Sequence, residues 1–120
     1  MRSSVADTQP FSQSWHPQGA PRALVVISHG LAEHSGRYGE LAAGLTARGY
    51  AVHALDHRGH GRSEGSRSNI GRFAGVVSDL GELIVRARRD HPGVPTFLLG
   101  HSMGGAIALA CALEHQAELR

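Results

Sequence analysis

A pentapeptide near the end of the chain, G-H-S-M-G at residues 100–104, constrains the fold more than any other feature. It follows an apolar, strand-like run at residues 94–99 and precedes small apolar residues, 105–113, that are typical of a helix. A serine on a sharp turn from strand to helix projects its hydroxyl above a sheet, and small neighbours permit that turn. The pattern therefore predicts an accessible, reactive hydroxyl at Ser102.

Strand-like and helix-like runs alternate along the rest of the chain. Buried-type apolar runs predict further strands at residues 23–28 and 50–55. Helical spacing at residues 38–45 and 73–87 predicts two helices, which stop at Gly49 and at residues 91–93. Such alternation indicates parallel strands joined by right-handed crossovers, in three α/β/α layers. We expect the first of the three strands to lie between the other two, residues 23–120 to belong to one domain, and residues 1–22 to form an extension with a leading strand near Phe11 to His16.

Three loops follow the predicted strands at the same edge of the sheet, where ligands of parallel α/β proteins bind. They span residues 29–37, 56–71 and 100–104, and they hold an unusual share of the glycine, histidine and arginine. The sequence therefore predicts that the functional site is assembled from these loops.

Acyl transfer would explain the residues in these loops, because it needs an activated nucleophile and two N–H donors for the developing oxyanion. Ser102 is the candidate nucleophile, and the donors are the amides of Met103 and Leu31. The supporting residues of the two loops are His29, Gly30, Gly100, His101 and Gly104. The alternative is that His29 and Gly30 form only a turn at the end of a strand.

Composition excludes several other chemistries. The chain of 120 residues has a net charge of +2, and its twelve Lys and Arg residues are all Arg, so it offers no Ser-Lys dyad, Schiff-base lysine or P-loop lysine. The single cysteine, Cys111, lies among Ala and Leu and is expected to be a buried packing residue. No apolar run is long enough to span a membrane, and the first 15 residues lack the apolar core of a signal peptide, so we expect a cytoplasmic protein.

Nine histidines raise the question of a metal site. His53, His57 and His60 lie close in sequence, but the chain has no H-E-x-x-H motif and Ala54 stands where a closely spaced ligand array would need histidine. The arginine-rich stretch 58–67 lacks interleaved aromatic residues and includes Glu64. We therefore expect no metal, no cofactor and no nucleic-acid partner.

Three motifs together resemble one family, the monoacylglycerol lipases and their lysophospholipase-like relatives among the serine aminopeptidase S33-like α/β-hydrolases. They are H-G-L-A-E-H-S-G-R-Y at residues 29–38, D-H-R-G-H-G-R-S-E-G at 56–65 and F-L-L-G-H-S-M-G-G at 97–105. The stretch H-S-G-R-Y is the most specific of these to the family. The resemblance runs from about Trp15 to the end of the chain.

The resemblance implies the N-terminal part of an α/β-hydrolase fold, with an eight-stranded sheet and a lid over an apolar acyl tunnel in the whole domain. It assigns Ser102 as nucleophile, and it implies a later Asp and His of the triad that have no match in this chain. His115 cannot replace that base, because thirteen residues of helix would place it about 20 Å from Ser102. We therefore expect the 120 residues alone to be inactive.

Two classes of function follow. The first is a serine carboxylic-ester hydrolase that forms an acyl-enzyme on Ser102, with a monoacylglycerol or a lysophospholipid as substrate and peripheral membrane contact through the lid outside this chain. Related aminopeptidase-like and thioesterase-like hydrolases stay open within this class. The second is a truncated α/β domain without catalysis.

Overall fold

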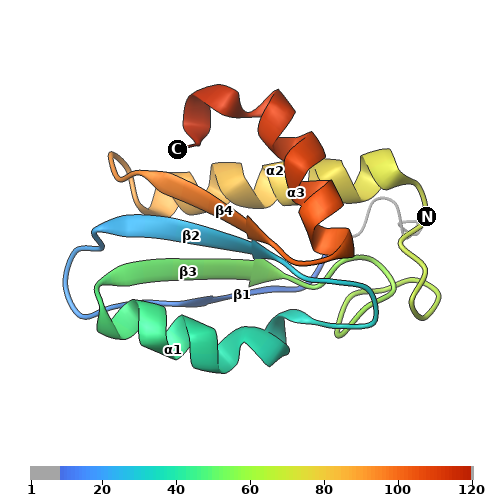
Figure 1. The fold of residues 1–120 in the computed structure, drawn as a ribbon, viewed down its shortest axis with the longest axis horizontal. Helices are drawn as coiled ribbons and strands as arrows, with labels where there is room; N and C mark the ends of the chain where they lie inside the picture. Colours follow the sequence, from blue (N-terminus) through green and yellow to red (C-terminus); the bar gives the residue numbers. More distant parts are fainter. Residues whose placement is uncertain (1–8, 120) are drawn as a thin grey trace, which may run out of the picture.

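Four strands form one mixed sheet in the order β1-β3-β2-β4 (Figure 1). The computed structural model describes residues 9–119. The strands are β1 Ser12–Trp15, β2 Ala23–Ser28, β3 Tyr50–Leu55 and β4 Thr96–Gly100. The helices are η2 Ser35–Tyr38, α1 Gly39–Ala47, α2 Phe73–Asp90, α3 Met103–Glu114 and η3 Gln116–Glu118.

The predicted parallel arrangement is confirmed for three strands, with β2 between β3 and β4. The strand β1, in the segment where a leading strand was considered, runs antiparallel to β3 and pairs Ser14 with His53. Only residues 16–22 connect β1 to β2. β2 runs parallel to β3. If β1 also ran parallel to them, a crossover of a dozen or more residues would have to lead from β1 to β2, so the short connection dictates the reversed direction of β1.

Helices cover both faces of the sheet, as the three-layer prediction required (Figure 1). On one face α1 packs over a small cluster that includes Ile27, Val52 and Ala54. On the other face α2 and α3 pack over a larger cluster, which contains Leu24, Val26, Ala51, Leu55, Leu80, Ile84, Ile107 and Cys111. The alternation of side chains along β2 and β3 supplies both clusters. Cys111 is buried, as expected.

The element boundaries differ from the sequence prediction mainly at β4 and α3. β4 begins at Thr96 because Pro95 has no N–H for the ladder, although its carbonyl still accepts from Leu24. α3 begins at Met103, two residues earlier than predicted, directly after Ser102. Within residues 9–119, no helix has the length and apolarity that crossing a bilayer demands.

Buried imidazoles join the carboxyl ends of β2 and β3. The His29 and His57 rings lie 4.4 Å apart between centroids, and Ser28 Oγ lies 3.0 Å from His57 Nε2. His29 Nε2 accepts the His57 backbone N–H at 2.9 Å. Burial lowers the pKa of His57 to about 3 and also lowers the pKa of His29. Both rings are therefore neutral at physiological pH.

The outer edge of β4 is apolar on the same side of the sheet as α1, in the part that α1 leaves exposed. Phe97 and Leu99 pair with Val25 and Ile27 on this face, and they are 44% and 40% exposed. On α3, Leu109 and Leu113 are 66% and 65% exposed. An exposed apolar edge strand invites pairing with another chain, because its backbone groups and side chains both lack partners.

We predict that Phe97→Glu reduces self-association of the purified chain while changing its stability by less than about 0.5 kcal/mol, since charged residues protect sheet edges and Phe97 is half exposed. Light scattering against concentration measures the association. Val85→Glu, at a residue of similar exposure on α2, is the matched control. Equal self-association of Phe97→Glu and the parent chain would contradict the prediction that the chain associates through the edge of β4.

We predict that stability falls as the pH is lowered from about 7 to 5, because the unfolded chain takes up protons that His57 resists in the folded chain. A shift of the His57 pKa from 6.5 to about 3 means that the folded state loses about 2 kcal/mol relative to the unfolded state at pH 5. Urea unfolding of His57→Gln should show a correspondingly flatter pH dependence. His34→Asn, at an exposed histidine, should keep the parent's slope.

Candidate active site

Ser102 and His101 form a two-residue turn between β4 and α3. β4 ends at Gly100, α3 begins at Met103, and Ser102 has φ 57° and ψ −121°. A residue with a side chain in such a region costs on the order of 1–3 kcal/mol, and neighbouring contacts must hold it there. Ser102 is exposed, so its hydroxyl is accessible from solvent.

Close packing against the end of β2 holds this turn in place. The backbone N–H of His101 donates to the Ser28 carbonyl at 3.1 Å. A Cβ added at Gly104 would collide with the carbonyl oxygens of Ser28 and His29, and one at Gly100 would lie 2.7 Å from the Gly104 oxygen. Glycine at both positions therefore allows α3 to start directly above β2.

The loop after β2 lies against the Ser102 turn, as the sequence predicted. A Cβ at Gly30 would lie 3.1 Å from the His101 carbonyl oxygen and 3.2 Å from its Nδ1, so the two backbones approach closely. Leu31 follows at the tip of this loop and is 57% exposed. Met103 is the first residue of α3, and its amide has no acceptor within the helix.

One carboxylate oxygen organises this loop. Glu33 Oε1 accepts from the Gly30 N–H at 2.8 Å and the Tyr38 hydroxyl at 2.8 Å, and it lies 3.3 Å from His101 Nδ1. The Gly30 N–H and then the Tyr38 hydroxyl lower the pKa of Glu33 to about 2. Burial, together with Glu33, raises the pKa of Tyr38 to about 12. The carboxylate therefore stays ionised and links the loop to the Ser102 turn.

His29 orients the next peptide group. Its Nε2 accepts a backbone N–H, so in the neutral ring Nδ1 carries the hydrogen and donates to the Gly30 carbonyl at 2.7 Å. In a trans peptide the C=O and the following N–H point in opposite directions. The Leu31 N–H must therefore point away from the His29 ring.

The third loop is tied to the others through Asp56. Its Oδ1 accepts the Ser35 N–H at 2.6 Å, and its Oδ2 accepts the Arg62 N–H at 2.9 Å. Burial raises the pKa of this carboxyl, but the Arg62 and Ser35 donors outweigh it, and the pKa is lowered. Asp56 is thus a charged anchor that holds the loop after β3 against the loop after β2.

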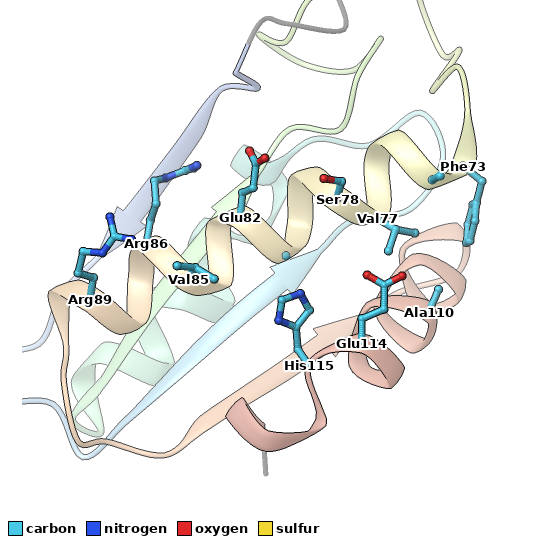
Figure 2. A pocket seen from close by; sticks show the side chains of 12 residues that line it. Phe73, Val77, Ser78, Glu82, Val85, Arg86, Arg89, Ala110, Glu114 and His115 are labelled. Atoms are coloured by element: carbon cyan, nitrogen blue, oxygen red, sulfur yellow. The ribbon is translucent and has the colours of Figure 1, made fainter.

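His101, His29 and His115 each have partners other than Ser102. His101 contacts Glu33, and His29 contacts Gly30 and His57. His115 lies at the end of α3, points toward α2 and contacts Glu118 at 3.4 Å (Figure 2). It lines a cavity of about 660 Å³ between α2 and α3, and none of that cavity's lining residues belongs to the three loops.

Sequence reasoning missed the positioning roles of Glu33, Tyr38, His57 and Asp56. The only signal for Glu33 was a carboxylate three residues after a loop glycine, a spacing that suits a side-chain bond back to the glycine amide. The His57 and Asp56 contacts join segments more than twenty residues apart, so no local pattern shows them. The structure brings together the predicted loops and adds the groups that hold them.

Comparisons with known proteins agree with this arrangement. The family model "Serine aminopeptidase, S33" of the hydrolases matches residues 19–120. Human monoglyceride lipase is 50% identical over 104 residues, which are 87% of this chain and 34% of the human protein. The monoacylglycerol lipase of Mycolicibacterium smegmatis is 46% identical over 104 residues, 87% of this chain and 37% of the relative.

The crystal structure of Paleococcus ferrophilus monoacylglycerol lipase superposes with a TM-score of 0.79 at 31% identity, covering 93% of this chain and 40% of that one. The chain thus spans about a third of the length of the curated relatives it matches. The family model matches residues 19–120, and the chain shares the fold of the monoacylglycerol lipase structure. The chain belongs to the serine aminopeptidase S33 family of α/β-hydrolases.

Proposed function

We propose that this chain carries the nucleophile and the oxyanion donors of a serine carboxylic-ester hydrolase. The observation that carries the proposal is the backbone of Ser102, φ 57° and ψ −121°, on a turn packed against the loop that contains Leu31. A strained, exposed serine beside two converging backbone segments is the arrangement that acyl transfer needs.

In this mechanism Ser102 Oγ attacks the acyl carbonyl carbon while a general base takes the hydroxyl proton. The carbonyl oxygen becomes an oxyanion that accepts hydrogen bonds from the Leu31 and Met103 amides. Collapse expels the alcohol, which takes a proton from the base, and leaves an acyl-enzyme for water to hydrolyse. The family resemblance assigns the base and its acid partner to a His and an Asp without counterparts in these 120 residues.

The proposed substrate is a monoacylglycerol, because the relatives at 46–50% identity are named monoglyceride or monoacylglycerol lipases. A yeast monoglyceride lipase at 28% identity and TM-score 0.78 was solved with a substrate analogue. The resemblance also implies a lid outside these residues, through which the protein would contact a lipid surface. Lysophospholipid, thioester and peptide substrates are the alternatives that the assay must separate.

We predict that the isolated chain hydrolyses p-nitrophenyl esters only at a residual rate, about 10³-fold over water, since an oxyanion hole and binding alone leave that much. A chimera that joins it to the remaining two thirds of the Mycolicibacterium enzyme should hydrolyse monoacylglycerol with saturation. Ser102→Ala in the chimera should lower kcat by roughly 10⁶-fold. Ser78→Ala, at an exposed α2 serine, is the control. Turnover that survives Ser102→Ala would refute the proposal.

We predict that Glu33→Gln lowers kcat of the same chimera by about 10- to 100-fold with a smaller change in KM, because a displaced oxyanion donor acts on the transition state. Tyr38→Phe removes one of the two short bonds to Glu33 and should have a smaller effect. Glu40→Gln, at an exposed carboxylate on α1, should leave both constants unchanged. A KM effect alone would show that Glu33 serves only substrate binding.

A further inference from the structure

Three histidines meet on the α2 face of the sheet, apart from the loops that surround Ser102. His16 directly follows β1, His53 lies on β3, and His91 caps the end of α2. One ring nitrogen of each lies within 4.8 Å of the others. The three ring centroids are 5.3 to 5.6 Å apart. Segments some forty residues apart in sequence thus place three imidazoles around one point.

The spacing of these nitrogens fits a tetrahedral metal ion. With Zn–N bonds of about 2.0–2.1 Å, two ligand nitrogens are separated by about 3.3 Å. The Nε2 atoms of His53 and His91 are already 3.2 Å apart. His16 is exposed, so its ring can close the remaining gap, on the order of 1.5 Å, by a side-chain rotation.

We infer that His16, His53 and His91 form a zinc-binding site. Three neutral imidazoles suit zinc and its neighbours among the transition metals, whereas magnesium and calcium prefer oxygen ligands. From the sequence, where His53 lies close to His57 and His60, no metal was expected. The fold gives His53 different partners, because its β3 side chain faces α2, where His91 lies.

A polar cavity of about 310 Å³ adjoins His53, one of the three histidines, and is lined also by Ser14, Arg86, Arg89 and Asp90. Water in this cavity can approach an ion from the His53 side and serve as the fourth ligand. The Ser14 hydroxyl lies 2.8 Å from His16 Nε2.

Charges of both signs lie near the site. Asp90 favours a cation near His53 and His91, and Arg86 opposes one near His53. Burial and the neighbouring His91 lower the pKa of His53 to about 4, and burial lowers that of His91. These two rings are therefore neutral near pH 7, the form in which histidine binds a metal.

A bound ion would cross-link the N-terminal strand to β3 and to the end of α2. Ligands that bind only the folded state stabilise it by mass action, and a clip across long chain segments removes freedom mainly from the unfolded state. The inference does not depend on the proposed ester hydrolysis, because none of the three histidines belongs to the three loops.

The test is a calorimetric titration of the untagged, chelator-treated 120-residue chain with zinc chloride near neutral pH, together with thermal unfolding. We expect one zinc ion per chain, a melting temperature that rises with zinc concentration, and no such response to magnesium. Cobalt(II) should give the visible absorption of a tetrahedral site. His16→Gln and His91→Gln should each weaken zinc binding at least about tenfold.

His34→Asn removes an exposed imidazole elsewhere and should bind zinc like the parent chain. His16 is itself exposed, so far-UV circular dichroism should show that His16→Gln keeps the fold. Absence of saturable one-to-one binding, or equal binding by the parent and both cluster variants, would overturn the inference. The cluster would then be a hydrogen-bonded histidine group only.

Discussion

The close approach of α3 to the carboxyl end of β2 is the constraint on which the rest of the site depends. Gly104 lies against the carbonyls of Ser28 and His29, and the His101 N–H bonds to the first of these. This contact fixes where α3 starts, and with it the backbone of Ser102. Because β2 lies between β3 and β4, the turn that holds Ser102 is packed against the central parallel strand of the sheet.

The same strand end also carries the second half of the candidate site. Ser28 reaches His57, and His29 holds the Gly30 carbonyl and thereby aims the Leu31 amide. Glu33 then connects Gly30 to His101, so that the loop after β2 is linked to the turn that holds Ser102. Preorganised dipoles of this kind need no rearrangement when charge develops on a substrate oxygen, which is why such contacts matter for acyl transfer.

Local patterns in the sequence were sufficient for most of the fold. The bounds of β2 and β3 were predicted to the residue, because continuous apolar runs between loops leave little choice. β4 and α3 shifted by up to two residues, since a proline and a glycine contact decided their ends. The antiparallel direction of β1 follows from a short connection, which a count of residues could have revealed.

Contacts between residues that are far apart in the chain could not be predicted from the sequence. The turn at Ser102 and the two loops around it follow from motifs, yet the Glu33 hub, the His29 tautomer and the Asp56 anchor depend on contacts across the fold. The histidine cluster shows the same limit, because proximity in sequence suggested His57 and His60 as neighbours of His53, and the pleat of β3 selected His91 instead.

The packing at Gly104 has a consequence for how this sequence can vary. The space between α3 and β2 holds no methyl group at that position, whereas an exposed loop residue such as Leu31 meets no such limit. The side chains of the loop can therefore vary while the volume beneath the turn stays fixed. The backbone geometry at Ser102 depends on the absence of a side chain at Gly104, so a larger residue at position 104 would disturb it.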